Sequence, residues 1–207
     1  MLTVTTGAVD ATTFLRLGNV FSSVITGNLV LLGMAAGRRS GTLAISGGLA
    51  LSGYAAGVLV GAMLAGPLRR DQPIWPRRVT ITLAAELAVL ACLAGGWLLS
   101  DGRPAADARL GLLPLAAAAM GMQSAAIRRL GQLSTTYLTG TLTGLLTALA
   151  TRRRPAGWHR DTTILFALVI GAATGALTAF RSPGWLPVVI LTPLAVVTTA
   201  SLAIAEP

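Results

Sequence analysis

The sequence contains few charged residues, one cysteine and one histidine, and each scarcity excludes a class of protein. Charged residues make up 11% of the 207 residues, whereas soluble domains carry roughly 25%, so the chain cannot cover a globular surface with polar groups. Cys92 stands alone in an apolar run, which excludes a disulfide framework and a cysteine metal site. We find no nucleophile beside a base, no cluster of metal ligands and no glycine-rich phosphate loop. We therefore expect no enzyme, no cofactor and no bound metal.

Apolar residues dominate the chain, and all of its basic residues are arginines. The hydrophobic share is 54% and the formal net charge is +9, with a mean hydropathy of +0.73. The arginines fall between long apolar runs, where basic residues fix the topology of a membrane protein and meet anionic lipid headgroups. This placement argues against nucleic acid as a partner and for the lipid bilayer.

Four apolar stretches have the length of one membrane crossing, which needs about 20 residues. They are Leu43 to Ala65, Val79 to Leu99, Thr162 to Phe180 and Trp185 to Ile204. Short connectors rich in arginine, proline or glycine separate them. The spans therefore lie next to one another with little mass outside the membrane.

Two further stretches, Thr3 to Ala36 and Leu112 to Ala150, are too long for one straight crossing. As continuous helices they would reach roughly 50 and 60 Å at 1.5 Å per residue. Each contains arginine and glycine near its middle, at Arg16 and Gly18 and at Arg129 and Gly131. We expect each stretch to be either one broken helix or a pair of short membrane segments.

These two stretches are also similar to each other. Residues 16–29 align without a gap to residues 129–142, with identities that include an arginine and a Thr-Gly pair. A one-residue shift sets 7–11 against 121–125, and Gly57 and Gly61 against Gly171 and Gly175. Such a match indicates duplication of a structural unit.

The duplication predicts the fold class: an all-α polytopic membrane protein forming a single membrane domain, 1–207. The internal repeats are about 3–99 and about 112–204. If each unit holds three crossings, the second enters from the opposite side, which gives six transmembrane helices as two inverted repeats with a broken first helix. If each long stretch makes two crossings, the units hold four crossings and are parallel. We favour the first arrangement.

Glycines spaced by four residues, at Gly53, Gly57 and Gly61 and again at Gly171 and Gly175, predict close helix contacts. Such contacts form either within the chain or across a homodimer.

The distribution of arginines predicts the orientation of the chain in the membrane. With six crossings, eight connector arginines share one side and five the other, which favours a bacterial inner membrane protein with both termini in the cytoplasm.

Helix breaks at membrane depth leave peptide groups open, and such groups are tolerated only inside protein or beside a water-filled cavity. Polar side chains near the breaks, together with the acid in the third span, form the predicted binding site for a small polar or anionic solute. We take the breaks to lie at Gly18, Gly27, Gly131 and Gly140. The candidate site residues are Asp10, Arg16, Ser22, Ser23, Thr26, Asn28, Glu86, Gln123, Ser124, Arg129, Thr135, Thr136, Thr139 and Thr141.

Each of these candidates also has a structural alternative. Serine and threonine in membrane helices often bond to a preceding carbonyl or to a neighbouring helix. Arg16 and Arg129 can extend to the membrane surface or pair with Asp10 or Glu86. Glu86 lies alone in its apolar span, which indicates either ion coupling or a buried polar contact.

The motifs at 7–11, 16–18 and 26–29, with their counterparts at 121–125, 128–131 and 135–142, resemble the signatures of the YoaK family. The resemblance covers essentially the whole chain and implies a multi-spanning bacterial inner-membrane protein of an uncharacterised family. Two features depart from the pattern: Ser124 stands where the family usually has Asn, and family members usually begin with more apolar residues. The resemblance implies the class of protein and no substrate.

Our leading functional hypothesis is a small transporter or permease that binds its solute at mid-membrane between the two broken helices. A dimeric ion or solute channel is the second hypothesis. A non-transporting scaffold that binds lipid or protein is the third.

Overall fold

The structure is a computed structural model that describes residues 1–67, 75–130, 138–152 and 157–204. This part of the chain is all-helical, with no strand. Its elements in the first half are α1 (Leu2–Thr12), the π-helix η1 (Thr13–Gly18), α2 (Ile25–Arg38), α3 (Gly41–Ala65) and α4 (Arg77–Leu99). In the second half they are α5 (Ala106–Arg129), α6 (Leu138–Ala150), α7 (Trp158–Arg181), the short 3₁₀-helix η3 (Pro183–Trp185) and α8 (Leu186–Ile204).

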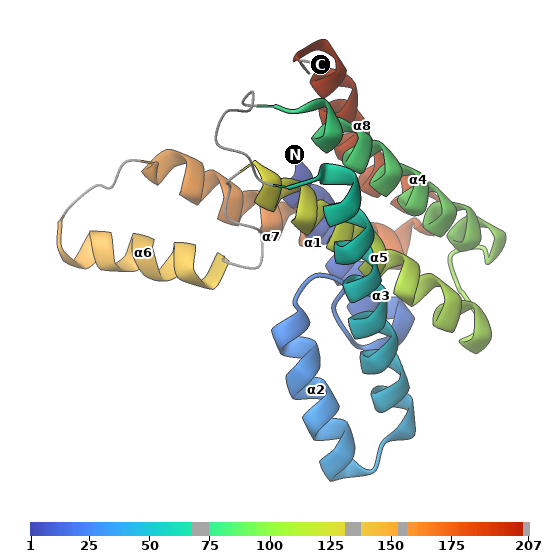
Figure 1. Cartoon of the computed structure of the whole chain (residues 1–207). Helices are drawn as coiled ribbons and strands as arrows, with labels where there is room; N and C mark the ends of the chain where they lie inside the picture. Colours follow the sequence, from blue (N-terminus) through green and yellow to red (C-terminus); the bar gives the residue numbers. More distant parts are fainter. Residues whose placement is uncertain (68–74, 131–137, 153–156, 205–207) are drawn as a thin grey trace.

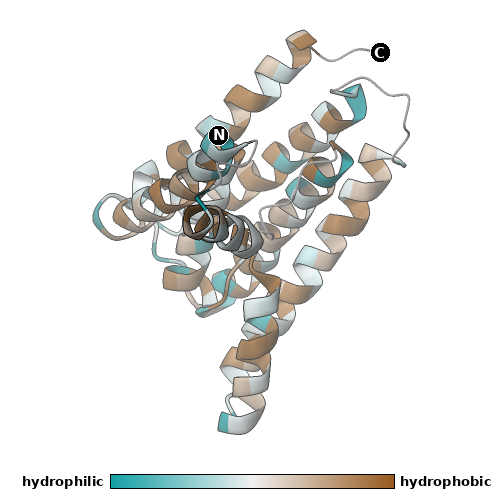
Figure 2. Cartoon of the chain, turned by 90° about the vertical axis from the view of Figure 1, so that its left-hand side faces the viewer, coloured by the Kyte–Doolittle hydropathy of each residue, from teal (hydrophilic) through white to brown (hydrophobic). Residues whose placement is uncertain are grey.

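In the described residues, five helical segments are long and apolar enough to cross a membrane: Gly41–Ala65, Arg77–Leu99, Ala106–Arg129, Trp158–Arg181 and Pro183–Ile204. The four simple spans expected from the sequence lie on four of these segments. The fifth, α5, forms the first part of the second long stretch. Hydrophobic residues run along the lengths of the helices, and hydrophilic ones gather near their ends (Figure 2).

Helices α4, α5 and α8 supply most of the buried core, in which Leu83, Leu90, Trp97, Met120 and Ile190 are almost fully enclosed. Helix α5 is the most buried of the spanning helices and lies between α3 and α4 (Figure 1). The pair α2 and α3 extends from this core as a hairpin, and α6 and α7 form a second hairpin that extends in another direction (Figure 1).

Glycines permit two close helix contacts. On α3, Gly53, Gly57 and Gly61 lie against the backbone of α5 at Pro114, Ala118 and Met122. Residue numbers rise together along both helices, so α3 and α5 run in the same direction. The backbones touch at these points with no room for a Cβ atom, which is the packing that small residues allow in a bilayer.

The second contact joins α1 to α7 in the same way. Gly171 lies against Val4 and Gly175 against Ala8, so these two helices are also parallel. Gly171 and Ala118 lie 114 residues after Gly57 and Val4, the same shift that aligns the two long stretches in the sequence. The glycine-rich helix of each half thus packs against the first helix of the other half: α3 against α5, and α7 against α1.

Helices α1 and α5, the first helices of the two halves, run in opposite directions where they meet. Thr6 near the start of α1 bonds to Gln123 near the end of α5. Gly18, at the end of η1, lies against Leu113 in the first half of α5. Residue numbers therefore rise along one helix as they fall along the other.

We predict that Gly57→Ala destabilises the protein, because an added methyl group would collide with the backbone of Ala118. Overpacking of this kind costs about 1–3 kcal/mol, and the loss of helical circular dichroism in detergent should shift to a lower temperature. The control is Gly48→Ala on the same helix, because nothing lies within 4 Å of its added Cβ. Equal melting temperatures for the two variants would contradict the observed packing.

Candidate functional site

The first long stretch leaves the helical conformation at Gly18 and returns to it at Ile25. Asn19 adopts a left-handed conformation with φ of 54°, which ends η1. Across the gap, the Asn28 side chain accepts a hydrogen bond from the Phe21 N–H at 2.9 Å and donates one to the Phe21 carbonyl at 2.6 Å. The amide of Asn28 thus satisfies both peptide groups of one residue in the break.

Asp10 lies on α1 beside this break and accepts four hydrogen bonds from two neighbouring residues. The N–H and hydroxyl of Ser22 donate to Oδ1 at 2.8 and 2.7 Å. The N–H of Ser23 donates to Oδ1 at 2.8 Å, and its hydroxyl donates to Oδ2 at 2.5 Å. All three side chains are buried. The carboxylate of Asp10 therefore holds the interrupted segment in place. Asp10, Ser22 and Ser23 were predicted to bind the solute, but in this structure they bond to one another.

The two arginines of the repeated motif occupy equivalent places at two different helix ends. The Nη2 of Arg16 donates to the carbonyl of Ala179 near the end of α7 at 2.8 Å, and its guanidinium stacks on Phe180, 4.2 Å from the ring centre. The Nε of Arg129 donates to the carbonyl of Ala65 at the end of α3 at 3.2 Å. A cation at a helix C-terminus satisfies open carbonyls and opposes the negative end of the helix dipole.

Neither arginine pairs with Asp10 or Glu86 within the described residues. Each instead ties the end of one half's first helical segment to the glycine-rich helix of the other half. Both arginines therefore stabilise the contact between the two halves.

A cavity of about 310 Å³ opens where η1 ends. The first turns of α3 and α5 form its other walls. The charged side chains that line it are Arg16 and Arg109, and the uncharged polar ones are Asn19, Thr42 and Ser46. Its volume lies in the range of small-molecule sites, roughly 300–1,000 Å³.

Two arginines and the uncapped start of α5 give this cavity a positive electrostatic character, whereas the Ser40 side chain caps the start of α3. The first N–H groups of a helix have no partner within the helix and carry the positive end of its dipole. No side chain caps the start of α5, where Ala105 is the N-cap residue. Asp107 belongs to the same turn but is not among the residues that line the cavity. This arrangement suits a small anion.

A second polar group, the buried triad of Thr6, Gln123 and Glu86, lies in the core. The Thr6 hydroxyl donates to Gln123 Oε1 at 2.6 Å, and Gln123 Nε2 donates to Glu86 Oε1 at 3.0 Å. The three residues come from α1, α5 and α4, and each is at most 1% exposed. The other carboxyl oxygen of Glu86 has no partner in the described structure.

The remaining predicted residues do not gather at one place. Thr26 is exposed on α2, and Thr139 is exposed on α6. Ser124 is buried on α5 and Thr141 is half-buried on α6. Thr135, Thr136 and Gly131 lie outside the described residues. The predicted breaks at Gly27 and Gly140 are wrong, because Gly27 lies in the first turn of α2 and Gly140 in that of α6.

The sequence prediction omitted five polar residues that the structure places in these sites: Thr6, Asn19, Thr42, Ser46 and Arg109. Asn19 had a signal, since it directly follows the glycine at the break. Arg109 is one of the five connector arginines used above to predict the orientation. The sequence did not show that α5 begins at Ala106, which places Arg109 on its first turn. For metals, the described residues contain no group of three His, Cys, Asp or Glu side chains that could hold an ion.

Together these features define the class: a multi-pass α-helical membrane protein with an interrupted first segment and polar sites between its helices. The chain belongs to the family described as protein of unknown function (DUF1275), whose match covers residues 1–201. It is 33% identical over 207 aligned positions to the UPF0700 transmembrane protein YoaK of Bacillus subtilis (strain 168), covering 92% of this chain and 88% of that protein. The family resemblance found in the repeated motifs is thus confirmed. No solved structure matches the chain.

We predict that Asp10→Ala destabilises the protein strongly and that Asp10→Asn does so less. Alanine leaves four donors of Ser22 and Ser23 without an acceptor, and each unsatisfied buried donor costs roughly 1–3 kcal/mol. Asparagine retains an oxygen that can accept some of these bonds. Thermal melting in detergent measures the order, with Asp107→Ala, an exposed acid, as control. A melting temperature of Asp10→Ala equal to that of the control would rule out this role.

Proposed function

We propose that this chain is a small transporter, not an enzyme, and that it binds a small anion in the cavity at the first helix break. The observation that carries the proposal is the composition of the cavity wall: two arginines, the uncapped first turn of α5 and, among the residues that the structure describes, no acid. Such a wall stabilises negative charge without a metal or a covalent step. The polar residues of the break bound by Asp10 serve to keep the cavity in shape.

Contact directions support an architecture of six crossings arranged as two inverted units of three. Antiparallel contacts between α1 and α5 favour inversion, because units of four crossings would set these two helices parallel. The matched glycine contacts and the matched bonds of Arg16 and Arg129 support the same pairing of the halves. In this arrangement α1, η1 and α2 form one broken crossing, and α2 continues toward the surface from which α3 returns.

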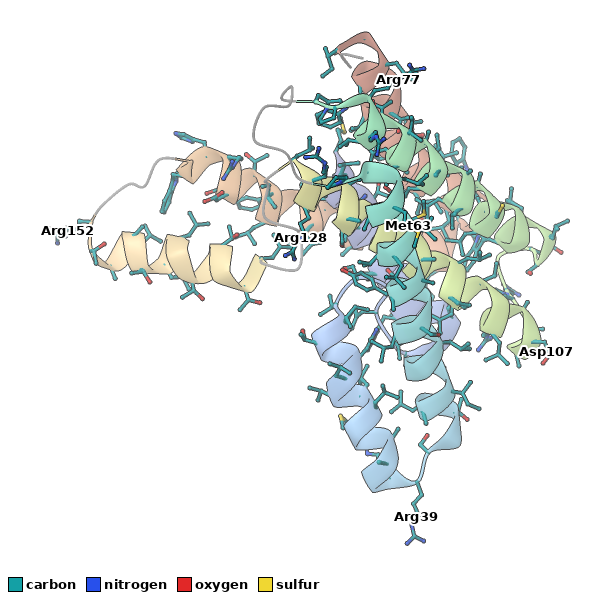
Figure 3. The ribbon with its side chains drawn as sticks, in the orientation of Figure 1. Arg39, Met63, Arg77, Asp107, Arg128 and Arg152 are labelled. Carbon is teal, nitrogen blue, oxygen red and sulfur yellow. The ribbon has the colours of Figure 1, made fainter. Side chains whose placement is uncertain are left out.

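The arginines orient this architecture. Arg39 lies at the outer end of the α2–α3 hairpin and Asp107 at the start of α5, whereas Arg77 and Arg152 lie at the start of α4 and the outer end of α6 (Figure 3). The connectors on the side of Arg77 and Arg152 carry eight of the arginines counted above, so we assign that side to the cytoplasm of the bacterial inner membrane. Both termini then lie in the cytoplasm, and the cavity opens to the outside.

A carrier fits the core better than a channel does. Leu113 and Met120 on α5 and Leu90 on α4 are buried in one apolar core, and we infer that this core closes the path beyond the cavity. Passage of an anion would therefore require the two halves to move, as in alternating access. Inverted repeats supply two such states because each half can adopt the conformation of the other.

We predict that anions stabilise the wild-type protein and that Arg109→Gln weakens this effect at least about tenfold in midpoint concentration, as expected for loss of a charge-assisted contact. Thermal melting is measured with formate, nitrate, phosphate and sulfate, followed by uptake of the stabilising anion into proteoliposomes. Arg16→Gln should act similarly, but it also removes the bond to Ala179 on another helix. The Nε of Arg109 donates to the Pro104 carbonyl five residues earlier, so Arg109→Gln disturbs only a local contact and is the cleaner variant.

The matched control is Arg103→Gln, an exposed arginine that lines a different surface pocket. It should bind and transport like the wild type. If none of the four anions stabilises the wild-type protein or enters the liposomes, the proposed function is wrong. If Arg103→Gln loses as much as Arg109→Gln, general surface charge explains the effect and the cavity does not.

A further inference from the structure

Glu86 lies near the middle of a membrane-spanning helix. It is the tenth residue of the 23 in α4, about 14 Å from the helix start at 1.5 Å per residue. Its side chain is fully buried, and the neighbouring turns of α4 place Leu83 and Leu90 in the same core. Ionisable residues at this depth are costly and usually serve ion or proton movement.

Gln123 holds one side of the Glu86 carboxyl group. The short bond from the Thr6 hydroxyl to Gln123 Oε1 turns the amide so that its nitrogen faces Glu86. Glu86 Oε1 therefore accepts a hydrogen bond from Gln123 Nε2. Oε2 is buried and has no partner in the described structure.

This leaves Glu86 incompletely satisfied in both of its states. As a carboxylate it has no cation beside it, since it forms no ion pair within the described residues. As a carboxylic acid, its Oε2–H has no acceptor. Buried polar groups in stable proteins are seldom left this way, and an exception points to a function.

The surrounding helices supply few other charges. Helix α8 has no titratable side chain, α3 has Tyr54, and α1 has Asp10, which is bound to Ser22 and Ser23. Helix α5 carries Asp107, Arg109, Arg128 and Arg129, which lie in its first and last turns. Cys92 on α4 is exposed. None of these groups bonds to Glu86, so a proton is the ion that neutralises it with the fewest further ligands.

The helices that hold the triad also form the anion cavity. Helix α5 carries Gln123 and, near its other end, Arg109. Helix α1 carries Thr6 and continues through η1 to Arg16 and Gly18. A shift of either helix on anion binding therefore changes the contacts of Glu86, which is the physical requirement for coupling two sites.

We propose that Glu86 binds and releases one proton in each transport cycle, so that anion and proton cross the membrane together. The proton adds to a Glu86 carboxylate oxygen to form the acid and leaves from the same oxygen on the other side of the membrane, with no other bond made or broken. This coupling rests on the proposed function. The carboxyl group is a proton carrier, and Gln123 and Thr6 are positioning residues.

Proteoliposomes loaded with a pH-sensitive dye test the coupling. Uptake of whichever of formate, nitrate, phosphate or sulfate the wild type transports should rise about tenfold under an inward proton gradient, a typical coupling factor, and should acidify the interior. Glu86→Gln should bind and exchange the same anion across the membrane but lose both the gradient effect and the acidification. Asp107→Asn, an exposed acid outside the cavity, should behave like the wild type.

A second measurement detects the proton directly and needs no transported anion. Infrared difference spectra of the reconstituted wild-type protein between acidic and alkaline buffer should contain the band of a buried carboxylic acid, absent from Glu86→Gln. If Glu86→Gln does not fold, Gln123→Met is used instead, and the band should shift because the carboxyl group has lost its donor.

The outcomes separate the two proposals. If no anion of the panel binds or moves, the proposed function fails, and the proton-coupled cycle fails with it whatever the infrared band shows. If the rate of anion uptake does not depend on the proton gradient, and Glu86→Gln transports at the wild-type rate, the proposed coupling is wrong. The proposed transport function is then still supported. Acceleration by a sodium gradient in place of a proton gradient would also overturn the assignment of the proton.

Discussion

The bilayer offers no water to an open peptide group, and this constraint accounts for the arrangement of the first segment. Wherever a membrane helix is interrupted, its freed N–H and C=O groups must find partners inside the protein. Asp10 supplies acceptors for Ser22 and Ser23, and Asn28 serves both peptide groups of Phe21. The interruption is therefore stable beside the cavity. The cavity is lined by other polar residues, which do not bond to the peptide groups of the interruption. The polar groups thus divide into those that maintain the interruption and those that line the cavity, where we propose that the anion binds.

The same constraint explains why the two halves depend on each other. Each glycine-rich helix, α3 or α7, accepts the first helix of the opposite half at backbone contact, and each ends on a carbonyl that takes an arginine from that half. Apolar side chains gain little by leaving lipid for a protein core, so close backbone packing and hydrogen bonds must provide the association energy. Neither half has a complete set of these contacts alone. Either half by itself would leave the glycine face of its α3 or α7 helix without a partner helix. The carbonyl at the end of that helix would also lose its arginine.

Hydropathy and spacing predicted the simple spans well, because length and apolarity are what the bilayer selects. The glycine contacts followed from their four-residue spacing. Gly18, predicted as a helix break, is the last residue of η1. The sequence could not distinguish a glycine that ends a helix from one inside its first turn, so Gly27 and Gly140 were misassigned. Nor could it reveal that Ser22 and Ser23 face Asp10, since that contact needs the chain to fold back over 12 residues. Arg109 was missed because its role depends on three separate helix ends meeting.

The two halves have diverged at their polar positions while keeping their packing, and this difference has a physical consequence. The shift that pairs Gly57 with Gly171 sets Ser124 opposite Asp10 and Ala200 opposite Glu86. A serine offers one oxygen and no charge where the first half has a carboxylate with four bonds, so Ser124 lacks the set of acceptors that Asp10 provides. Ala200 on α8 likewise has no ionisable group where α4 has Glu86. In the proposed transport cycle, two inverted halves with equal polar groups would favour their two conformations equally. Because the first half carries both Asp10 and Glu86, the two conformations of the proposed transport cycle would differ in energy. We propose that the protonation state of Glu86 shifts the balance between them.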